Sequence, residues 1–578
     1  MLIILEAVLA NIILVGYGIF FKKIFRLRYV LHYYSESIFF GLIFLSFFGL
    51  LINFFLPLNS IVSFLIFSFG ILLFFLDFRK NFNKKKELCI FLITSSLLVL
   101  FVLSFSKVYD DFGLYHLPSV IRISESNISL GVSNINFRYG HNFILFYVMA
   151  FFTNDILGLQ GILLIEAIIY VNFLIFLLNN FYKRRNPFLE KLSLFLLIIF
   201  LVKFFDFGDQ GLDVPIVIFF FLIIYNFLHI FYLNKQVSVF NFFKIIFILS
   251  LFIISLKLSQ ILIIILPLTI FFYFRNLLVD YEKIKYYLMI ATPFFLWLLS
   301  NLLLSSCILY PVKQTCLNTS WSPPQENWNS SPAEVYTEIS AWSKGWIDSL
   351  PGRGAKVEWE NRGQVLNHMK NFTNGEWKTV WFNVHFKEKI FKNILFYLSI
   401  IVLFYFSFRK NNINYFNDSA NILNKYLLIF SSLSIVFWFN TAPLLRFGFA
   451  QIILFIFCLG NIFLLNNIRI FPKKKNTQLI VIVSLSIFFI RNAFLQKVNN
   501  FKIDYLRPYP SFYSKSVIKS QPAYDTLIFF NNLILNISNG ANCFDIPFPC
   551  SDFIRSKDKS NIDIKKELIF KKFIVIKN

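Results

Sequence analysis

Two neighbouring carboxylates, Asp110 and Asp111, stand at the start of a polar segment that directly follows an apolar run at residues 88–105. Adjacent carboxylates at a membrane surface repel each other and lose hydration, so they persist best where they bind a cation, accept a proton from a substrate, or do both. The alternative is structural, because an aspartate at such a position often caps the next helix, which would begin near Phe112. The pair therefore predicts either a catalytic or metal site or a helix cap.

The residues that follow the acidic pair continue to supply polar side chains to a loop that returns to the membrane. They include His116, Arg122, Glu125, Asn136, Arg138, Tyr139, His141 and Asn142. Polar loops held on a rigid scaffold commonly carry function. We interpret Asp110 and Asp111 as catalytic residues and metal ligands, and His116 and Arg138 as substrate-binding residues.

A second acidic cluster consists of Asp206, Asp209 and Asp213, on a predicted outer turn between two apolar runs. Asp213 begins the second run. It either caps that helix or faces the same cavity as the acidic pair, where it would bind substrate. We interpret Asp206 and Asp209 as solvated loop charges.

Two cations stand where a membrane protein rarely places them. Lys257 interrupts two short apolar runs, at residues 245–256 and 261–274, which predicts a broken hairpin. Its ammonium group either extends to the outer interface or binds a lipid phosphate. Arg446 lies on a predicted outer turn, against the positive-inside tendency, and binds either an anionic substrate group or a nearby carboxylate.

Tryptophan and cysteine mark the polar segments. Seven of the nine tryptophans lie in residues 305–392, where indoles anchor the loop and pack locally or, less favoured, stack on sugar rings. Cys307 with Cys316 and Cys543 with Cys550 are spaced for two short-range disulfides outside the cytoplasm. His368 and His385 have no cysteine at a zinc-like spacing.

The elements that must position these residues are membrane helices. Of the 578 residues, 57% are hydrophobic and only 15% are charged, which a water-soluble fold could not bury behind a polar surface. Phenylalanine contributes 80 residues, which we interpret as lipid-facing. The net charge of +24 comes from basic clusters between apolar runs, so it indicates the positive-inside rule and no nucleic-acid partner.

The apolar runs predict an all-α polytopic protein of about 14 transmembrane helices. The expected parts are N-terminal helices at 1–106, a first large external loop at 107–155, helices at 156–304, a Trp-rich external loop at 305–392, helices at 393–490 and a small C-terminal extracytoplasmic domain at 491–578. Alternating sidedness puts the acidic pair, Asp213, Lys257 and Arg446 on one outer face. Because the sequence has no phosphate-binding glycine loop, a nucleotide-sugar or ATP substrate is not expected.

The order of these features resembles the GT-C superfamily, multi-spanning glycosyltransferases that use polyprenyl-phosphate sugars. An acidic pair in the first large external loop, directly after a spanning helix and followed by a histidine and an amphipathic loop, is similar to the pattern of that family. Further short motifs follow in order at residues 109–142, 211–215, 310–311, 443–447 and 543–550. Three spans before the one that precedes the acids depart from the simplest pattern, which leaves the correspondence of helices open.

The resemblance implies a membrane glycosyltransferase of the bacterial inner membrane, active on the extracytoplasmic face. Asp110 or Asp111 would act as catalytic base or bind a divalent cation, Mg²⁺ or Mn²⁺. Asp213, Tyr310, Lys257 and Arg446 would contact the polyprenyl-phosphate-sugar donor, whose sugar would pass to a glycan, lipid or protein acceptor. Two other functions stay open: a cell-surface polysaccharide polymerase or ligase, and a non-enzymatic lipid or solute transporter.

Overall fold

A computed structural model describes most of the membrane part of the chain and pieces of its tail. The described residues are 2–27, 32–80, 85–103, 111–153, 161–182, 186–203, 211–232, 236–322, 330–350, 362–408, 418–465, 478–480, 482–488, 490, 524–528, 534–538, 547–551, 565–566 and 571–572. They belong to two compact units. Unit 1 comprises Met1–Asn179, Lys203–Ser331 and Ile487–Asn578, and unit 2 comprises Asn180–Val202 and Pro332–Ser486.

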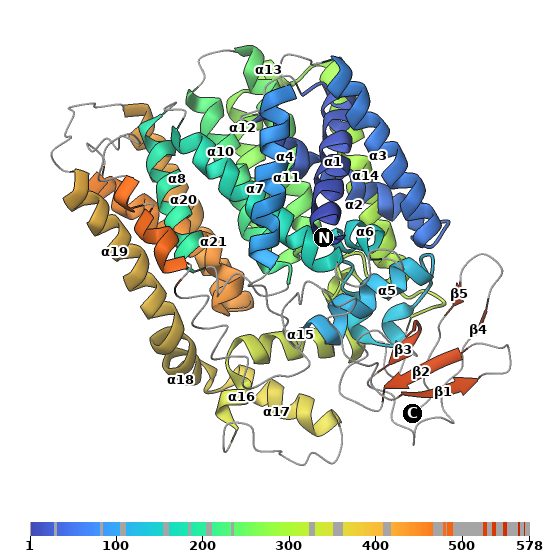
Figure 1. Ribbon diagram of the computed structural model, residues 1–578. Helices are drawn as coiled ribbons and strands as arrows, with labels where there is room; N and C mark the ends of the chain where they lie inside the picture. The colour runs from blue at the N-terminus through green and yellow to red at the C-terminus, as the bar shows by residue number, and fades with distance from the viewer. Residues whose placement is uncertain are drawn as a thin grey trace. The chain divides into compact units, whose positions relative to one another are not determined.

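Unit 1 is built mainly of long apolar helices (Figure 1). They are α1 (Leu2–Ile24), α2 (Tyr33–Asn53), α3 (Ser60–Lys80), α4 (Lys85–Leu103), α7 (Gly161–Tyr182, as far as Asn179), α10 (Asp213–Tyr232), α11 (Gln236–Leu256) and α14 (Tyr281–Ser305), with the shorter α12 (Ile265–Tyr273) and α13 (Arg275–Leu278). A helix of about 20 residues spans the hydrocarbon core, so these lengths suit a bilayer.

Eleven helices among the described residues are long and apolar enough to cross a membrane, which makes the chain an integral membrane protein. The prediction of about fourteen counted three further runs. In the described part of the chain, α8 (Pro187–Val202) has 16 residues, and the apolar helices Leu258–Tyr273 and Gln478–Phe488 are also short. Sixteen residues of helix rise only about 24 Å, less than the hydrocarbon thickness of about 30 Å.

Glycines bring the first helices of unit 1 into backbone contact. A β-carbon at Gly18 of α1 would lie 1.7 Å from the Ser37 carbonyl oxygen of α2, and one at Gly41 would lie 2.0 Å from the Leu14 carbonyl oxygen. No side chain fits at either position. Small residues at helix interfaces are how membrane helices pack closely when lipid supplies no hydrophobic driving force.

Phenylalanine is not only lipid-facing, as its abundance suggested. Phe146, Phe151, Phe173 and Phe195 are among the largest fully buried side chains, whereas Phe64 and Phe75 of α3 are exposed on the apolar surface. The lipid-facing interpretation is therefore wrong for many of the phenylalanines. Composition reports how much apolar surface the chain has, and helix packing decides which part of it is covered.

The predicted broken hairpin is confirmed in unit 1. Helix α11 ends at Leu256, Lys257 is extended with φ −158° and ψ 119°, and a 3₁₀ helix, η5 (Leu258–Ile264), leads into α12. Lys257 therefore occupies the break between two helical segments.

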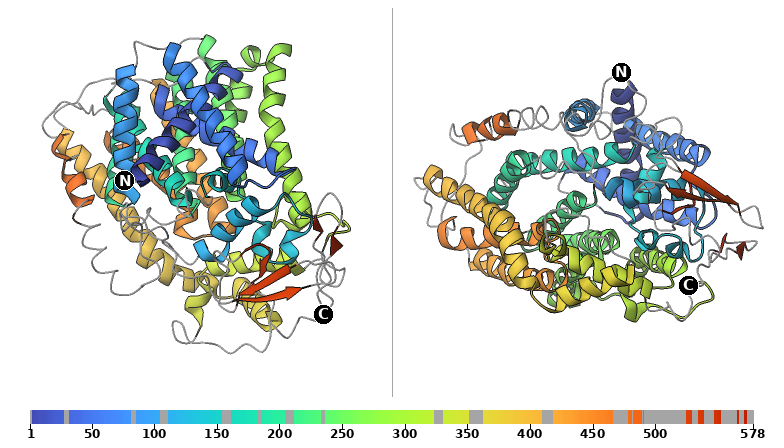
Figure 2. Two further views of the ribbon diagram at one scale, coloured as in Figure 1. Left: turned by 45° about the vertical axis from the view of Figure 1, so that its right-hand side comes forward. Right: turned by 90° about the horizontal axis from the view of Figure 1, so that it is seen from below.

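The first large loop is a set of short helices beyond the end of α4. It contains η2 (Phe112–His116), α5 (Leu117–Glu125), η3 (Val132–Asn134), η4 (Phe137–Gly140) and α6 (Leu145–Phe152). Figure 2 shows these segments gathered at one end of the long helices of unit 1, next to the strands of the tail.

Unit 2 consists of helices and carries most of the described tryptophans. Its elements are α8, α15 (Ser330–Ser343), α16 (Trp346–Ser349), α17 (Arg362–Asn374), α18 (Trp377–Trp381), η7 (Phe382–Ile390), α19 (Phe391–Phe408), α20 (Asp418–Thr441), α21 (Leu445–Gly460) and η9 (Asn461–Leu465). The indole N–H of Trp381 donates to the Pro443 carbonyl oxygen at 2.6 Å, and that of Trp346 to His368 Nδ1 at 2.9 Å. Local packing, the favoured interpretation, is confirmed for these two tryptophans. Trp328 and Trp359 lie outside the described residues.

The described part of the tail forms strands, so the all-α description holds for the membrane part of the chain and not for this segment. Strands β1 (Tyr524–Ile528) and β2 (Ile534–Ser538) pair antiparallel, and β3 (Cys550–Ser551) adds to β2 in parallel. Strands β4 (Lys565–Lys566) and β5 (Lys571–Lys572) form a separate pair.

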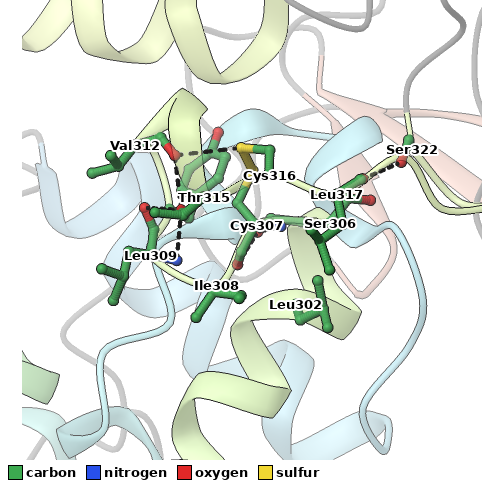
Figure 3. The surroundings of a disulfide bond; sticks show 12 residues. Leu302, Ser306, Cys307, Ile308, Leu309, Val312, Thr315, Cys316, Leu317 and Ser322 are labelled. Carbon is green, nitrogen blue, oxygen red and sulfur yellow. Dashed lines mark hydrogen bonds between the residues drawn. A yellow bond between two sulfur atoms is a disulfide. The ribbon is translucent and has the colours of Figure 1, made fainter.

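One predicted disulfide is confirmed and half of the other can be described. Cys307 and Cys316 are bonded, and Figure 3 shows them closing the turn after α14, where Leu317 N–H donates to the Ser306 carbonyl oxygen. Cys550 is also disulfide-bonded. Its predicted partner, Cys543, lies outside the described residues.

Candidate functional site

The first large loop of unit 1 is hydrogen-bonded to the ends of helices that are predicted to lie on one side of the membrane. Asn53, at the end of α2, donates from Nδ2 to the carbonyl oxygens of Ile123 and Ser126 at 3.2 and 2.9 Å. Gly131 N–H donates to the Leu303 carbonyl oxygen of α14 at 2.9 Å. These hydrogen bonds hold the loop against the ends of α2 and α14, and we call this loop, from Asp111 to the end of α6, the platform.

The tail reaches the same platform. The Tyr139 hydroxyl donates to the Cys550 carbonyl oxygen at 3.2 Å, and the Phe548 N–H donates to Glu125 Oε2 at 2.8 Å. The Tyr139 and Phe548 rings also meet edge to face, 5.9 Å between centroids. Segments that are predicted to be external therefore meet one another within unit 1.

A buried polar network holds the second half of the loop against α14. Asn142 Nδ2 donates to Ser300 Oγ at 2.6 Å and to Asn301 Oδ1 at 3.0 Å, while the Tyr147 hydroxyl donates to Asn142 Oδ1 at 2.8 Å. The Trp297 indole donates to the Asn142 carbonyl oxygen at 2.7 Å. Because fully paired buried networks are rigid, the backbone on either side of Asn142 is held in place.

Directly before Asn142, the ring of His141 sits in a cluster of aromatic side chains. It stacks parallel to Phe143 at 5.7 Å and meets Tyr310 edge to face at 5.4 Å between centroids. Tyr115 lies 6.4 Å from it and 4.4 Å from His116. We call Tyr115, His116, His141, Phe143 and Tyr310 the ring cluster.

Tyr310 is distant in sequence from the rest of the ring cluster but is held in place by contacts with the loop. Its hydroxyl donates to the Phe137 carbonyl oxygen at 2.8 Å, and its ring covers Gly140, where a β-carbon would lie 2.6 Å from the ring. The glycine is what allows this close approach.

An ion pair joins two of the predicted substrate-binding residues in unit 1. Lys257 Nζ lies 2.5 Å from Asp213 Oδ1, and the two side chains keep 21% and 26% of their exposure. Asp213 is the first residue of α10, and Lys257 is at the break after α11. Asp213 offsets part of the charge of Lys257. This holds for both predicted roles of Lys257, extension to the interface and phosphate binding.

The ion pair and the ring cluster are neighbours. Ile144 N–H donates to the Ser255 carbonyl oxygen at 3.3 Å, which fixes the loop beside the end of α11, two residues before Lys257. On the other side, Gly211 lies close to His116, since a β-carbon there would be 3.5 Å from the His116 ring. Gly211 is two residues before Asp213.

The electrostatics of His141 reflect these neighbours. Burial of the ring, followed by the positive charges of Arg138 and Lys257 and by His116, lowers the pKa of His141 to about 4. His141 lies in the loop, outside the spanning helices. Because its pKa is well below 7, the His141 imidazole is uncharged at neutral pH.

Asp111 is at the start of this platform, while Asp110 lies outside the described residues. Helix η2 begins at Phe112, as the capping interpretation requires, but the Asp111 side chain makes no capping hydrogen bond. The structure therefore does not support capping by Asp111. Asp206 and Asp209 also lie outside the described residues.

The geometry of a metal site is not present in the described part of the chain. Within it, no three His, Cys, Asp or Glu side chains come together to hold an ion. The described residues alone therefore form no cation site; Asp110, the other half of the acidic pair, lies outside them.

Arg446 belongs to unit 2 and is described there alone. It is an exposed residue in the first turn of α21, with Cζ 5.1 Å from the centre of the Phe447 ring. The turn before it is held by two indoles, Trp381 on the Pro443 carbonyl oxygen and Trp438 on that of Leu444, at 2.6 and 2.9 Å.

The structure thus brings His116, Tyr310, Asp213, Lys257 and Arg138 into one region of unit 1. His141 lies with them, although from the sequence it was only one of several polar loop residues. The sequence places His141 three residues after Arg138 and directly before Asn142. In the structure, Asn142 anchors the loop. The sequence alone does not predict the contact of His141 with Tyr310.

A family model described as "Domain of unknown function (DUF8201)" matches residues 1–453. The match includes every residue of the ring cluster, the Asp213–Lys257 pair and Arg446, and it ends before the tail. No curated protein and no solved structure matches the chain.

Proposed function

The chain belongs to the DUF8201 family, and from its own residues we propose that it is a membrane glycosyltransferase that moves a sugar from a polyprenyl-phosphate donor to an acceptor on the extracytoplasmic face. One observation carries the proposal. A neutral histidine, two tyrosines, two cations and a carboxylate converge on one platform over the helix ends of unit 1, and that platform begins at Asp111. A lipid carrier would reach such a platform from within the membrane.

The chemistry assigned to these groups is displacement at the anomeric carbon. The acceptor hydroxyl oxygen attacks that carbon, the bond from the carbon to the phosphate oxygen breaks, and the electron pair leaves with the lipid phosphate. Arg138 and Lys257 offset the charge that gathers on the leaving phosphate. Arg446, in unit 2, stays a predicted substrate-binding residue. The acidic pair, Asp110 and Asp111, receives the acceptor proton or binds a divalent cation, Mg²⁺ or Mn²⁺.

Isotope-labelled undecaprenyl-phosphate sugars, incubated with the purified protein and a membrane extract as the source of acceptors, test the function. Transfer of one labelled sugar to each glycan, lipid or protein acceptor supports a transferase. Label that accumulates in a growing chain supports a polysaccharide polymerase or ligase. Label that stays on the carrier, with no release of undecaprenyl phosphate, contradicts both and favours a lipid or solute transporter in the bacterial inner membrane.

The acidic pair offers the sharpest variant. Replacing Asp110→Asn together with Asp111→Asn should abolish transfer while the protein still inserts and elutes as the wild type does. The matched control replaces Asp206→Asn and Asp209→Asn, two other loop acids interpreted as solvated charges, and should keep full activity. Transfer that survives in the Asp110/Asp111 double variant would end the proposal.

A further inference from the structure

The proposed function leaves two roles open for the acidic pair, proton acceptor or cation ligand, and the ring cluster bears on that choice. A proton acceptor must be unprotonated at working pH, have a nitrogen or oxygen available to receive the proton, and be held still beside the reacting atoms. His141 meets each of these requirements.

The ring nitrogens of His141 are available. They make no hydrogen bond with any part of the chain that the structure describes, whereas His368 accepts a hydrogen bond from the Trp346 indole. The His141 side chain is half-buried, so solvent or a substrate hydroxyl can approach it. In a neutral imidazole, one nitrogen carries a lone pair that can accept a proton.

The orientation of His141 is set by packing and by the backbone. Phe143 lies parallel to its ring, with only 3° between the planes, and Tyr310 meets it edge to face. The backbone N–H of His141 donates to the Arg138 carbonyl oxygen at 3.1 Å, and Asn142 is locked to α14. A base held in this way needs little reorganisation to react.

The charges around His141 place it next to the expected phosphate. Arg138 and Lys257 are the two cations that act on His141, and Lys257 is itself paired with Asp213. His116, Tyr115 and Tyr310 are the other titratable groups that face it. In a polyprenyl-phosphate sugar the anomeric carbon is bonded to a phosphate oxygen, so a phosphate held by Arg138 and Lys257 brings the reacting carbon beside the imidazole.

We infer that His141 is the general base of the proposed transfer, accepting the proton of the acceptor hydroxyl as its oxygen bonds to the anomeric carbon. The inference rests on the proposed function. The proton moves to the lone pair of His141 while the phosphate departs with the electrons of the broken bond, and the imidazolium then releases the proton to water. The acidic pair is then not the proton acceptor.

The low pKa of His141 has a consequence for this step. In the free protein burial of the ring, and after it the charges of Arg138 and Lys257, disfavour the imidazolium. A bound phosphate offsets these two charges and so raises the pKa of His141 above about 4. The donor would thus strengthen the base that acts on it. Because kcat/KM reports the free protein and kcat the complex, the acid limb of kcat should lie at higher pH than that of kcat/KM.

Three variants test the assignment, with release of undecaprenyl phosphate from labelled undecaprenyl-phosphate sugar as the assay. His141→Phe keeps a ring between Phe143 and Tyr310 but has no nitrogen, and it should lose about 10²- to 10⁴-fold in kcat with little change in the KM for the donor. His141→Ala should behave likewise and regain activity when imidazole is added. His368→Asn, at an exposed histidine of unit 2, should match the wild type.

A chemical readout does not depend on turnover. Diethyl pyrocarbonate modifies unprotonated imidazoles, so His141 should be modified at pH 5.5, and undecaprenyl phosphate should slow the reaction. If His141 is not modified, or if His141→Phe keeps its kcat and the acid limb of its pH profile while the wild type transfers sugar, this inference is overturned and the glycosyltransferase proposal stands. If the wild type releases no undecaprenyl phosphate from any of the labelled sugars, the proposed function itself fails.

Discussion

The Asp213–Lys257 ion pair should couple two helices of unit 1 measurably. At 2.5 Å, two unit charges attract by about 1.7 kcal/mol in water and by about 7 kcal/mol at an effective dielectric constant of about 20. Both side chains are partly exposed, and each loses hydration when the pair forms, so the net coupling lies far below the larger figure. Hydrogen bonds to charged groups contribute about 1.5–3 kcal/mol, and we expect a coupling energy of about 2 kcal/mol here.

A double-mutant cycle measures this coupling energy. Asp213→Ala, Lys257→Met and the double variant are unfolded by sodium dodecyl sulfate in mixed micelles, and the free energies of unfolding are compared. Because the cycle cancels the effect of each single replacement, the loss of an acidic residue from the first turn of α10 does not enter the result. A coupling below about 0.5 kcal/mol would refute the reasoning, since it would mean that hydration offsets the whole attraction.

Two further predictions concern the helix contacts and the cation. Gly18→Ala should lower the free energy of unfolding by about 1–3 kcal/mol or more, because its β-carbon would overlap the Ser37 carbonyl oxygen. The control Gly375→Ala should lower it less, since a β-carbon there would lie 3.2 Å from its nearest atom. Equal effects of the two variants in the same micelle assay would contradict close α1–α2 packing. If the acidic pair binds a divalent cation, EDTA should abolish sugar transfer and Mg²⁺ or Mn²⁺ should restore it; full activity in EDTA would remove the cation from the proposed mechanism.

Much of the fold was predictable because the bilayer acts on each segment separately. A run of about 20 apolar residues is a spanning helix whatever its neighbours are, so the hydropathy of residues 61–75 predicts most of α3. The count of spans was less secure. The run at 192–205 belongs to a helix of only 16 described residues, and length alone cannot distinguish a short span from a segment that stays within the protein.

The candidate site was predictable as a set of residues and not as an arrangement. Asp213 and Lys257 were each singled out because a charge beside an apolar run is unusual, but each was assigned a separate role. Their pairing depends on the start of α10 meeting the end of α11, which no local pattern reports. For the same reason His141 was not distinguished from the other polar residues of its loop.

The amino-acid pattern alone predicts an integral membrane protein of many helices, the positions of its polar loops, the break of the hairpin at Lys257 and a bond between Cys307 and Cys316. These features follow from local composition and spacing. The packed structure was needed to show that Tyr310 packs against His141, that Asp213 pairs with Lys257 and that many phenylalanines are buried away from lipid. Such contacts depend on which helix ends and faces meet, and that is a property of the packed chain as a whole.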